Sequence, residues 1–139
     1  MNGLIERARQ ALDAQPFSRL LGASLEHIDA ESAVLTLPLR DDLKQQHGFA
    51  HGGVVSYLAD NALTFAGGAR LGGAAILTSE FKINYLRPAI GSLLVARAGV
   101  IHAGARQAVC RCDILAREQD TEKLVATAQG TIVKVDGAN

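Results

Sequence analysis

In the second half of the chain, apolar and polar residues alternate with the period of two that is typical of half-buried β-strands. The alternation is clearest over residues 76–86, where Leu77 and Phe81 share one parity and Thr78 and Lys82 share the other. The connections in this half are short enough for an antiparallel meander. The same pattern predicts three further strands, over residues 93–102, 107–116 and 124–135.

One segment in the first half has a different pattern, with apolar and small residues spread around a whole helical period. It covers residues 52–66, GGVVSYLADNALTFA, and begins at Gly52 and Gly53. Gly67 and Gly68 follow directly and predict its end. Because the segment is apolar on nearly every side, we expect a helix that is buried inside the structure rather than lying on its surface.

Shorter elements are predicted before this helix. Residues 1–15 carry charged residues among apolar ones at helical spacing, which predicts a short amphipathic N-terminal helix. Pro16 and Gly22 indicate a break after it, and Pro38 indicates the end of a strand or an edge position. Two short strands are predicted here, over residues 24–29 and 32–39.

Together these elements predict an α+β fold. An antiparallel sheet of five to six strands wrapped around one central helix buries the apolar helix and one face of every strand. We expect a single domain over residues 1–139, because a chain of this length forms one hydrophobic core and no segment has the composition of a linker.

The composition narrows the partners of this domain. Fourteen Lys and Arg residues balance fourteen Asp and Glu residues, so no basic field favours nucleic acid. Low charge also leaves little repulsion between copies, which favours self-association. Cys110 and Cys112 form no metal or redox motif, and no apolar run has the length of a membrane span. We therefore expect a cytoplasmic protein without a nucleic-acid or membrane partner.

Glycine makes up about 10% of the chain, above the usual figure of about 7%, and two glycines open the predicted central helix. The backbone N–H groups of Gly52 and Gly53 belong to the first helical turn, which lacks intrahelical acceptors and lies at the positive end of the helix dipole. Such a turn stabilises an oxyanion, and glycine lets a carbonyl group approach closely. The alternative is that both glycines only provide a tight entry into a crowded helix.

Asp60 is the one carboxylate within the predicted central helix. A buried carboxylate is costly unless it is hydrogen-bonded or used, so Asp60 is either a structural residue or a general base or nucleophile. His51 lies nine residues before it. On one helix the two residues are about 13 Å apart along the axis and on opposite sides. A site that uses both must therefore combine two chains, which predicts a symmetric dimer.

These residues, with several further motifs, resemble the PaaI-like (phenylacetyl-CoA thioesterase) branch of the hot-dog fold acyl-CoA thioesterases. The resemblance covers roughly residues 17–135. It implies a curved antiparallel sheet wrapped around a long central helix. The matching features are Gly48, the HGG turn at residues 51–53, Asp60, Thr78 eighteen residues later, FKINYLRP at residues 81–88 and VATAQGT at residues 125–131.

The resemblance implies catalytic roles for five residues. Asp60 corresponds to the catalytic carboxylate, supplied across the dimer interface as general base or nucleophile. The Gly52 N–H corresponds to the oxyanion donor, and His51 fixes that turn and helps to polarise the thioester carbonyl. Thr78 corresponds to a serine or threonine that positions water beside the carboxylate. Gln45 stands where several relatives carry asparagine, and its longer amide can orient the water or the carbonyl.

Five further residues are predicted to contact the substrate, including two arginines that suit the phosphates of coenzyme A. No metal or other cofactor is expected. His47 lies four residues before His51, but no spacing brings Asp60 beside both histidines on one chain. The predicted substrate contacts are Gly53, Tyr57, Asn61, Arg87 and Arg106.

The sequence and the resemblance together predict a thioester hydrolase that converts an aryl- or medium-chain acyl-CoA to the free acid and coenzyme A. The expected assembly is a homodimer, or a homotetramer made of two dimers. Two alternatives on the same fold stay open at this point. One is a non-catalytic acyl-CoA binding or sensing module, which has no need of Asp60. The other is a dehydratase or hydratase, which pairs a histidine with a carboxylate for proton transfer at carbon.

Overall fold

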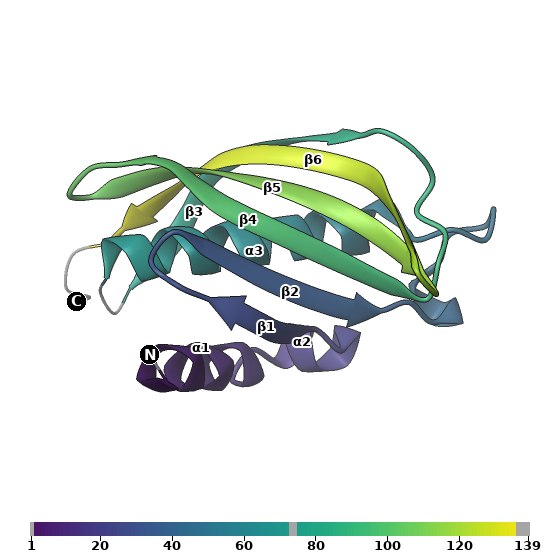
Figure 1. Cartoon of the computed structure of the whole chain (residues 1–139), viewed down its shortest axis with the longest axis horizontal. Coiled ribbons are helices and arrows are strands. Elements are labelled where there is room, and N and C mark those ends of the chain that lie inside the picture. The colour runs from purple at the N-terminus through teal and green to yellow at the C-terminus, as the bar shows by residue number, and fades with distance from the viewer. Residues whose placement is uncertain (1, 73–74, 136–139) are drawn as a thin grey trace.

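Figure 1 shows the computed structural model, which describes residues 2–72 and 75–135. Residues 1, 73–74 and 136–139, which include the first position of the predicted N-terminal helix and the end of the predicted domain, lie outside the described residues. The described part forms a six-stranded antiparallel sheet that curves around one long helix, so the predicted α+β hot-dog architecture is confirmed. Its elements are α1 (Asn2–Asp13), α2 (Pro16–Leu21), β1 (Ser24–Ile28), β2 (Ser32–Pro38), a 3₁₀ turn (Asp41–Leu43), α3 (Gly52–Leu71), β3 (Ile76–Tyr85), β4 (Leu93–Ala103), β5 (Gln107–Glu118) and β6 (Thr121–Lys134).

The strands lie in the order β1-β2-β4-β5-β6-β3, and each neighbouring pair is antiparallel. The predicted meander is therefore limited to β4, β5 and β6, whereas β3 pairs with the far side of β6. Figure 1 shows α3 beneath the curved sheet, with α1 and α2 beside β1. This order leaves β1 and β3 as the two edges of the sheet, and both edges contact α3.

Alternation along the strands produces the core between the sheet and α3. Leu35 of β2 and Cys110, Cys112 and Ile114 of β5 are fully buried. Burial raises the pKa of the Cys110 thiol to about 11. Burial, with the Asp113 charge as a second cause, raises the pKa of the Cys112 thiol well above its usual range. Both thiols are therefore protonated at neutral pH and serve as small core side chains.

The helix α3 continues to Leu71, five residues beyond its predicted end, so Gly67 and Gly68 lie inside it. The structure gives a packing reason for Gly67. A Cβ atom at this position would lie 2.8 Å from the Cβ atom of Ile132 on β6, closer than real Cβ atoms approach. Gly67 thus lets the helix lie against the sheet, although a glycine inside a helix costs about 1 kcal/mol relative to alanine.

The expectation of a central helix inside the structure is confirmed, but a single chain buries only one face of α3 completely. The cause is the incomplete closure of the sheet, which covers one side of the helix and leaves the other partly exposed. The buried face consists of Val54, Val55, Leu58, Ala59, Ala62, Leu63, Ala66 and Gly67. The partly exposed positions include Ser56, Tyr57, Asp60, Asn61 and Thr64.

A β-bulge in β3 changes which of its residues face α3. The pairing with β6 shifts between Thr78 and Glu80, so Ser79 is an extra residue. Thr78 therefore points toward α3, whereas Leu77 is 59% exposed. The predicted parity grouped Leu77 with Phe81 and placed Thr78 on the polar side, and it is wrong before the bulge. One inserted residue exchanges the two faces of a strand.

The segment predicted as a break between Pro16 and Gly22 contains the second helix, α2. Pro16 lies in the first turn, where a missing N–H costs nothing, and Gly22 ends the helix with a φ of +90°. The N–H of Gly22 donates to the carbonyl oxygen of Ser18, a fully buried residue. The two residues that indicate a break therefore mark the beginning and the end of a short helix.

The hairpin between β5 and β6 is tighter than predicted, because the polar residues 117–123 belong mostly to the two strands. Its turn consists of Gln119 and Asp120, and Gln119 has a φ of +54°. A turn of two residues lets the strands pair from Glu118 and Thr121 onward, with one irregularity where Val125 has no partner on β5.

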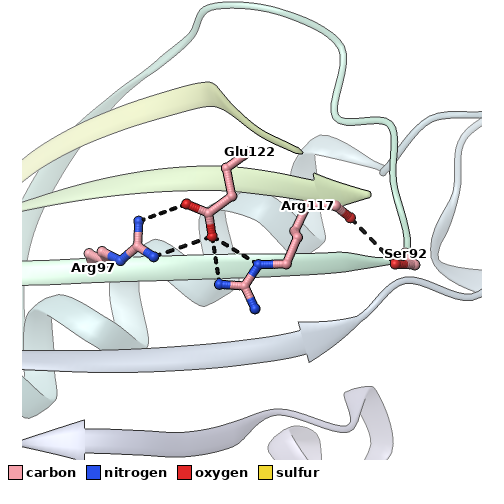
Figure 2. A network of polar contacts seen from close by, with 4 residues as sticks. All are labelled: Ser92, Arg97, Arg117 and Glu122. Atoms are coloured by element: carbon pink, nitrogen blue, oxygen red, sulfur yellow. Dashed lines mark hydrogen bonds and ion pairs between the residues drawn. The ribbon is translucent and has the colours of Figure 1, made fainter. Parts of the chain in front are cut away.

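Ion pairs on the outer face of the sheet explain how charged residues are accommodated there. Figure 2 shows Glu122 of β6 between Arg97 of β4 and Arg117 of β5, with N–O distances of 3.1 and 2.6 Å. Hydrogen bonds from Arg97 and then Arg117 hold the pKa of Glu122 below its usual range. The Ser92 N–H also donates to the Arg117 carbonyl at 2.9 Å, which ties the segment after β3 to this end of the sheet.

We expect Glu122→Gln to lower the free energy of unfolding by about 1 kcal/mol at pH 7, because both arginines lose their carboxylate partner. A lowered pKa in the folded state stabilises the protein above the pKa of the unfolded state. The difference from wild type should therefore shrink as the pH falls below about 4. Urea unfolding at several pH values measures this, with Glu118→Gln as control because the described residues give Glu118 no ion pair. A difference that stays constant down to pH 3 would contradict the expectation.

Candidate active site

The N-terminus of α3 is organised by His51, which is its N-cap residue. The Nδ1 atom of His51 accepts a hydrogen bond from the Gly53 N–H at 2.8 Å. Because Nδ1 is an acceptor, a neutral His51 ring carries its proton on Nε2. A Cβ atom on Gly53 would lie 2.9 Å from Nδ1, so the imidazole packs directly over this glycine. The two glycines after His51 thus have different roles, since the Gly53 amide is already engaged.

The Gly52 amide is free to bind a ligand. No acceptor among the described residues takes its N–H, which points out from the first turn of a 20-residue helix. The Tyr85 hydroxyl donates to the Gly52 carbonyl at 3.2 Å and holds this peptide group in place. Tyr85 was not among the predicted site residues. Its position at the end of a predicted strand carried no signal that it would meet the start of the helix.

A cleft of about 340 Å³ opens beside the Gly52 amide. It brings together three of the predicted site residues, Gln45, Gly52 and Arg87, from three separate segments of the chain. The side-chain oxygen of Gln45 accepts from the His47 N–H, which fixes the orientation of the amide. The remaining lining residues are Phe49, Ala50, Val55, Tyr85, Leu86, Pro88, Ala89 and Val125.

Asp60 lies in a compact polar cluster with two threonines. The Thr78 hydroxyl donates to Asp60 Oδ1 at 2.6 Å. Thr64, one helical turn after Asp60, donates to the Asp60 carbonyl at 2.8 Å, and its Oγ1 lies 2.9 Å from Thr78 Oγ1. The described residues give Asp60 Oδ2 no hydrogen bond. Asp60 and Thr78 are among the predicted site residues and Thr64 is not, although its spacing of four residues from Asp60 on a helix was a usable signal.

Asp60 and the Gly52 amide do not share a site within one chain. His51 caps the same continuous helix that carries Asp60 nine residues later, so the separation of about 13 Å along the axis applies. Asp60 does not line the cleft beside Gly52. One chain therefore carries two separate functional groups. An unused amide donor lies at the start of the helix, and a carboxylate lies further along it.

Two predicted substrate contacts lie outside the cleft and bind α2 instead. The Tyr57 hydroxyl donates to the Ser18 hydroxyl, and Asn61 Nδ2 lies 3.0 Å from the Tyr57 hydroxyl oxygen. Asn61 Nδ2 also donates to Gln15 Oε1 at 3.1 Å. Phe17 packs edge-to-face on the Tyr57 ring with a centroid distance of 5.4 Å. This cluster fastens α2 to α3 beside Asp60.

The two predicted phosphate contacts lie at opposite ends of the sheet. Arg87 follows the end of β3 and lines the cleft, whereas Arg106 lies in the β4–β5 hairpin, where its carbonyl accepts from the Lys134 N–H. Lys134 pairs with Ile76 at the start of β3, so the two arginines are separated by the length of that strand, about 30 Å. They cannot contact one phosphate group within a single chain.

Within residues 2–72 and 75–135, no three His, Cys, Asp or Glu side chains lie close enough to hold a metal ion. No helix among the described residues is both long enough and apolar enough to cross a membrane.

Comparison with known proteins identifies the family. The model of the thioesterase superfamily matches residues 47–123. The acyl-coenzyme A thioesterase PaaI of Escherichia coli K12 is 31% identical over 121 residues, which cover 86% of this chain and 83% of that protein. A thioesterase family protein from Silicibacter pomeroyi superposes with a TM-score of 0.88 at 33% identity, covering 94% of this chain and 96% of that one. The E. coli PaaI structure gives a TM-score of 0.84 at 27% identity, covering 97% and 98%. This chain therefore belongs to the thioesterase superfamily and is a thioester hydrolase with the hot-dog fold.

Proposed function

We propose that this protein hydrolyses an aryl- or medium-chain acyl-CoA thioester to the free acid and coenzyme A. The observation that carries the proposal is the Gly52 amide, an unused donor at the start of a long helix beside a cleft. The relative named acyl-coenzyme A thioesterase supports the substrate class. Arg87 at the cleft suits a phosphate of coenzyme A, whereas Arg106 could serve the same molecule only from a second subunit.

The start of α3 is suited to the charge that forms during thioester hydrolysis. When a nucleophile attacks the thioester carbonyl, negative charge develops on the carbonyl oxygen. The Gly52 N–H stabilises that charge together with the positive end of the α3 dipole. The Nε2–H of His51 is a second donor at the same turn, because Nδ1 is engaged by Gly53. Both donors are fixed before the substrate arrives, which lowers the cost of reorganisation.

Asp60 acts in one of two ways. It attacks the carbonyl carbon itself, the C–S bond breaks to release the coenzyme A thiolate, and water then hydrolyses the acyl–Asp60 anhydride to the free acid while the thiolate takes up a proton; or it takes a proton from water that attacks the carbonyl carbon. In the second case the C–S bond then breaks, and the proton passes from Asp60 to the leaving thiolate. The Thr78 hydroxyl holds Asp60 Oδ1 in place. Asp60 Oδ2 accepts no hydrogen bond among the described residues and is the oxygen that takes the proton.

The open edge of β3 suits a dimer that unites the two halves of the site. Thr78, which holds Asp60, and Tyr85, which holds Gly52, lie seven residues apart on this strand, about 23 Å. Antiparallel pairing of two β3 edges about an axis near the middle of the strand places each Thr78 beside the other chain's Tyr85. Leu77 and Tyr85 are 59% and 56% exposed on this strand, and long apolar edges are usually covered.

We expect Asp60→Asn to lower kcat by about 1,000-fold or more, because amide nitrogen cannot accept a proton from water. Thiol release from a panel of acyl-CoA substrates measures the loss. Asp120→Asn, in the β5–β6 turn, is the matched control and should retain wild-type turnover. Turnover near wild type in Asp60→Asn would refute the proposed role. Tight acyl-CoA binding without thiol release by the wild type would indicate a binding module instead.

Gly52→Pro tests the oxyanion donor, because proline removes the N–H and is tolerated in the first turn of a helix. The extended backbone of His51 before it suits a following proline. We expect a loss of about 100- to 1,000-fold in kcat with little change in melting temperature. Gly52→Ala is the control: it keeps the N–H, and its Cβ meets the Tyr85 ring at 3.5 Å, an ordinary contact. Equal activity of the two variants would exclude Gly52 as donor.

Mixing Asp60→Asn and Gly52→Pro chains tests whether two subunits share a site. After complete subunit exchange, half of the dimers are mixed, and each mixed dimer has one intact site. We therefore expect about a quarter of wild-type activity from two inactive proteins. Exchange is verified by mass spectrometry of differently labelled chains. No recovery after verified exchange would show that the site is not shared in this way.

A further inference from the structure

A second hollow, which the proposed chemistry does not use, runs between α1 and α3. We call it the α1–α3 groove, and its volume is about 300 Å³. Of the described residues that line it, only Arg7 is charged. One wall is a single face of α1, the opposite wall is α3, and Ile28 and Ile76 complete it from the two sheet edges. The lining residues are Leu4, Arg7, Ala8, Ala11, Gln15, Ile28, Asn61, Thr64, Phe65, Gly68, Ala69 and Ile76.

The groove borders the Asp60 cluster at Thr64. Thr64 lines the groove, and its Oγ1 lies 2.9 Å from the Thr78 hydroxyl that donates to Asp60. Ile76 lines the groove two residues before Thr78 on β3. A group that lies in the groove beside Thr64 is therefore close to the carboxylate. The cleft at Gly52 has no lining residue in common with the groove.

The shape of the groove favours a narrow, extended occupant. Its α1 wall runs from Leu4 to Ala11, about 10 Å along the helix, and Gln15 lines it just before α2. Spread over at least about 10 Å, its 300 Å³ leave a cross-section of at most about 30 Å², which suits a narrow chain. Small side chains at Ala8, Ala11 and Gly68 keep this width open.

We propose that the α1–α3 groove holds the acyl chain of the substrate and selects straight aliphatic chains over aromatic acyl groups. The proposal rests on the proposed function, because the groove is connected to Asp60 rather than to a separate site. In the shared site, the acyl chain runs into the subunit that supplies Asp60, and the coenzyme A arm lies in the cleft of the subunit that supplies Gly52.

Ala11→Phe tests the groove without disturbing the core, because Ala11 is exposed on α1 and its side chain borders the groove. For the wild type, we expect kcat/KM to rise severalfold with each added methylene pair through the medium chain lengths. In Ala11→Phe, we expect kcat/KM for dodecanoyl-CoA to fall about tenfold or more while that for butyryl-CoA changes less than about twofold. Phenylacetyl-CoA completes the substrate series.

Two further variants strengthen the test. Gln10→Phe adds the same ring to the neighbouring exposed position, which does not line the groove, and should keep the wild-type profile. Gly68→Ala adds one methyl group that meets Ile76 at 3.5 Å, an ordinary contact, so the helix should gain stability while preference shifts to shorter chains.

Binding is measured separately from hydrolysis, as the Kd of dodecanoyl-CoA for Asp60→Asn with and without Ala11→Phe. We expect the added phenylalanine to raise this Kd about tenfold. An unchanged Kd and chain-length profile would overturn the groove assignment, as would wild-type preference for phenylacetyl-CoA over every straight chain. Absence of thiol release from all substrates would overturn the proposed function alone, since the Kd still decides the occupant of the groove.

Discussion

The sheet of this protein curls around α3 without closing, because β1 and β3 remain its two edges. Six strands cover one side of the helix and bury its small and apolar residues. The opposite side carries Ser56, Tyr57, Asp60, Asn61 and Thr64, which α1 and α2 cover only in part. Asp60 can keep a carboxylate oxygen without a hydrogen bond because the chain's own core does not cover this side of α3. The open sheet thus determines which side of the helix can carry polar residues.

The length of α3 is the second constraint, since it separates two groups of different chemistry. The helix start offers a fixed amide donor, held by His51 on one side and Tyr85 on the other. Asp60 lies more than two turns further along, on the other side of the axis. Close packing of Gly67 against Ile132 fixes the height of the helix above the sheet. One continuous helix keeps these two positions apart, so the proposed site requires a second chain.

The edge strand β3 lies beside both the start of α3 and Asp60. The bulge at Ser79 turns Thr78 toward Asp60 and leaves Leu77 on the outside. In the proposed dimer this edge connects the carboxylate of one subunit to the amide of the other. The proposal assigns the cleft beside Gly52 of one subunit and the groove beside Thr64 of the other to the two arms of one thioester. A substrate with a polar carrier and an apolar acyl group matches two such channels.

The sequence by itself determined the features that depend on local pattern. Alternation predicted the strands, and the glycines after His51 predicted where α3 begins. Asp60 became the candidate catalytic carboxylate because the predicted central helix contains no other. Together with the spacing of the family motifs, these signals were sufficient for the fold and the enzyme class. They were also sufficient to show that His51 and Asp60 lie on one helix and apart from each other.

Only the tertiary structure decided the features that depend on contacts between distant segments. Gly67 has the same sequence signature at a helix end and at a close helix–sheet contact, and only Ile132 distinguishes the two. The bulge at Ser79 depends on how β3 pairs with β6, and a period-two pattern carries no record of an inserted residue. Tyr85 reaches Gly52 because β3 ends beside the start of α3, 33 residues earlier in the chain. Such partners are set by packing in three dimensions, which local residue preferences do not encode.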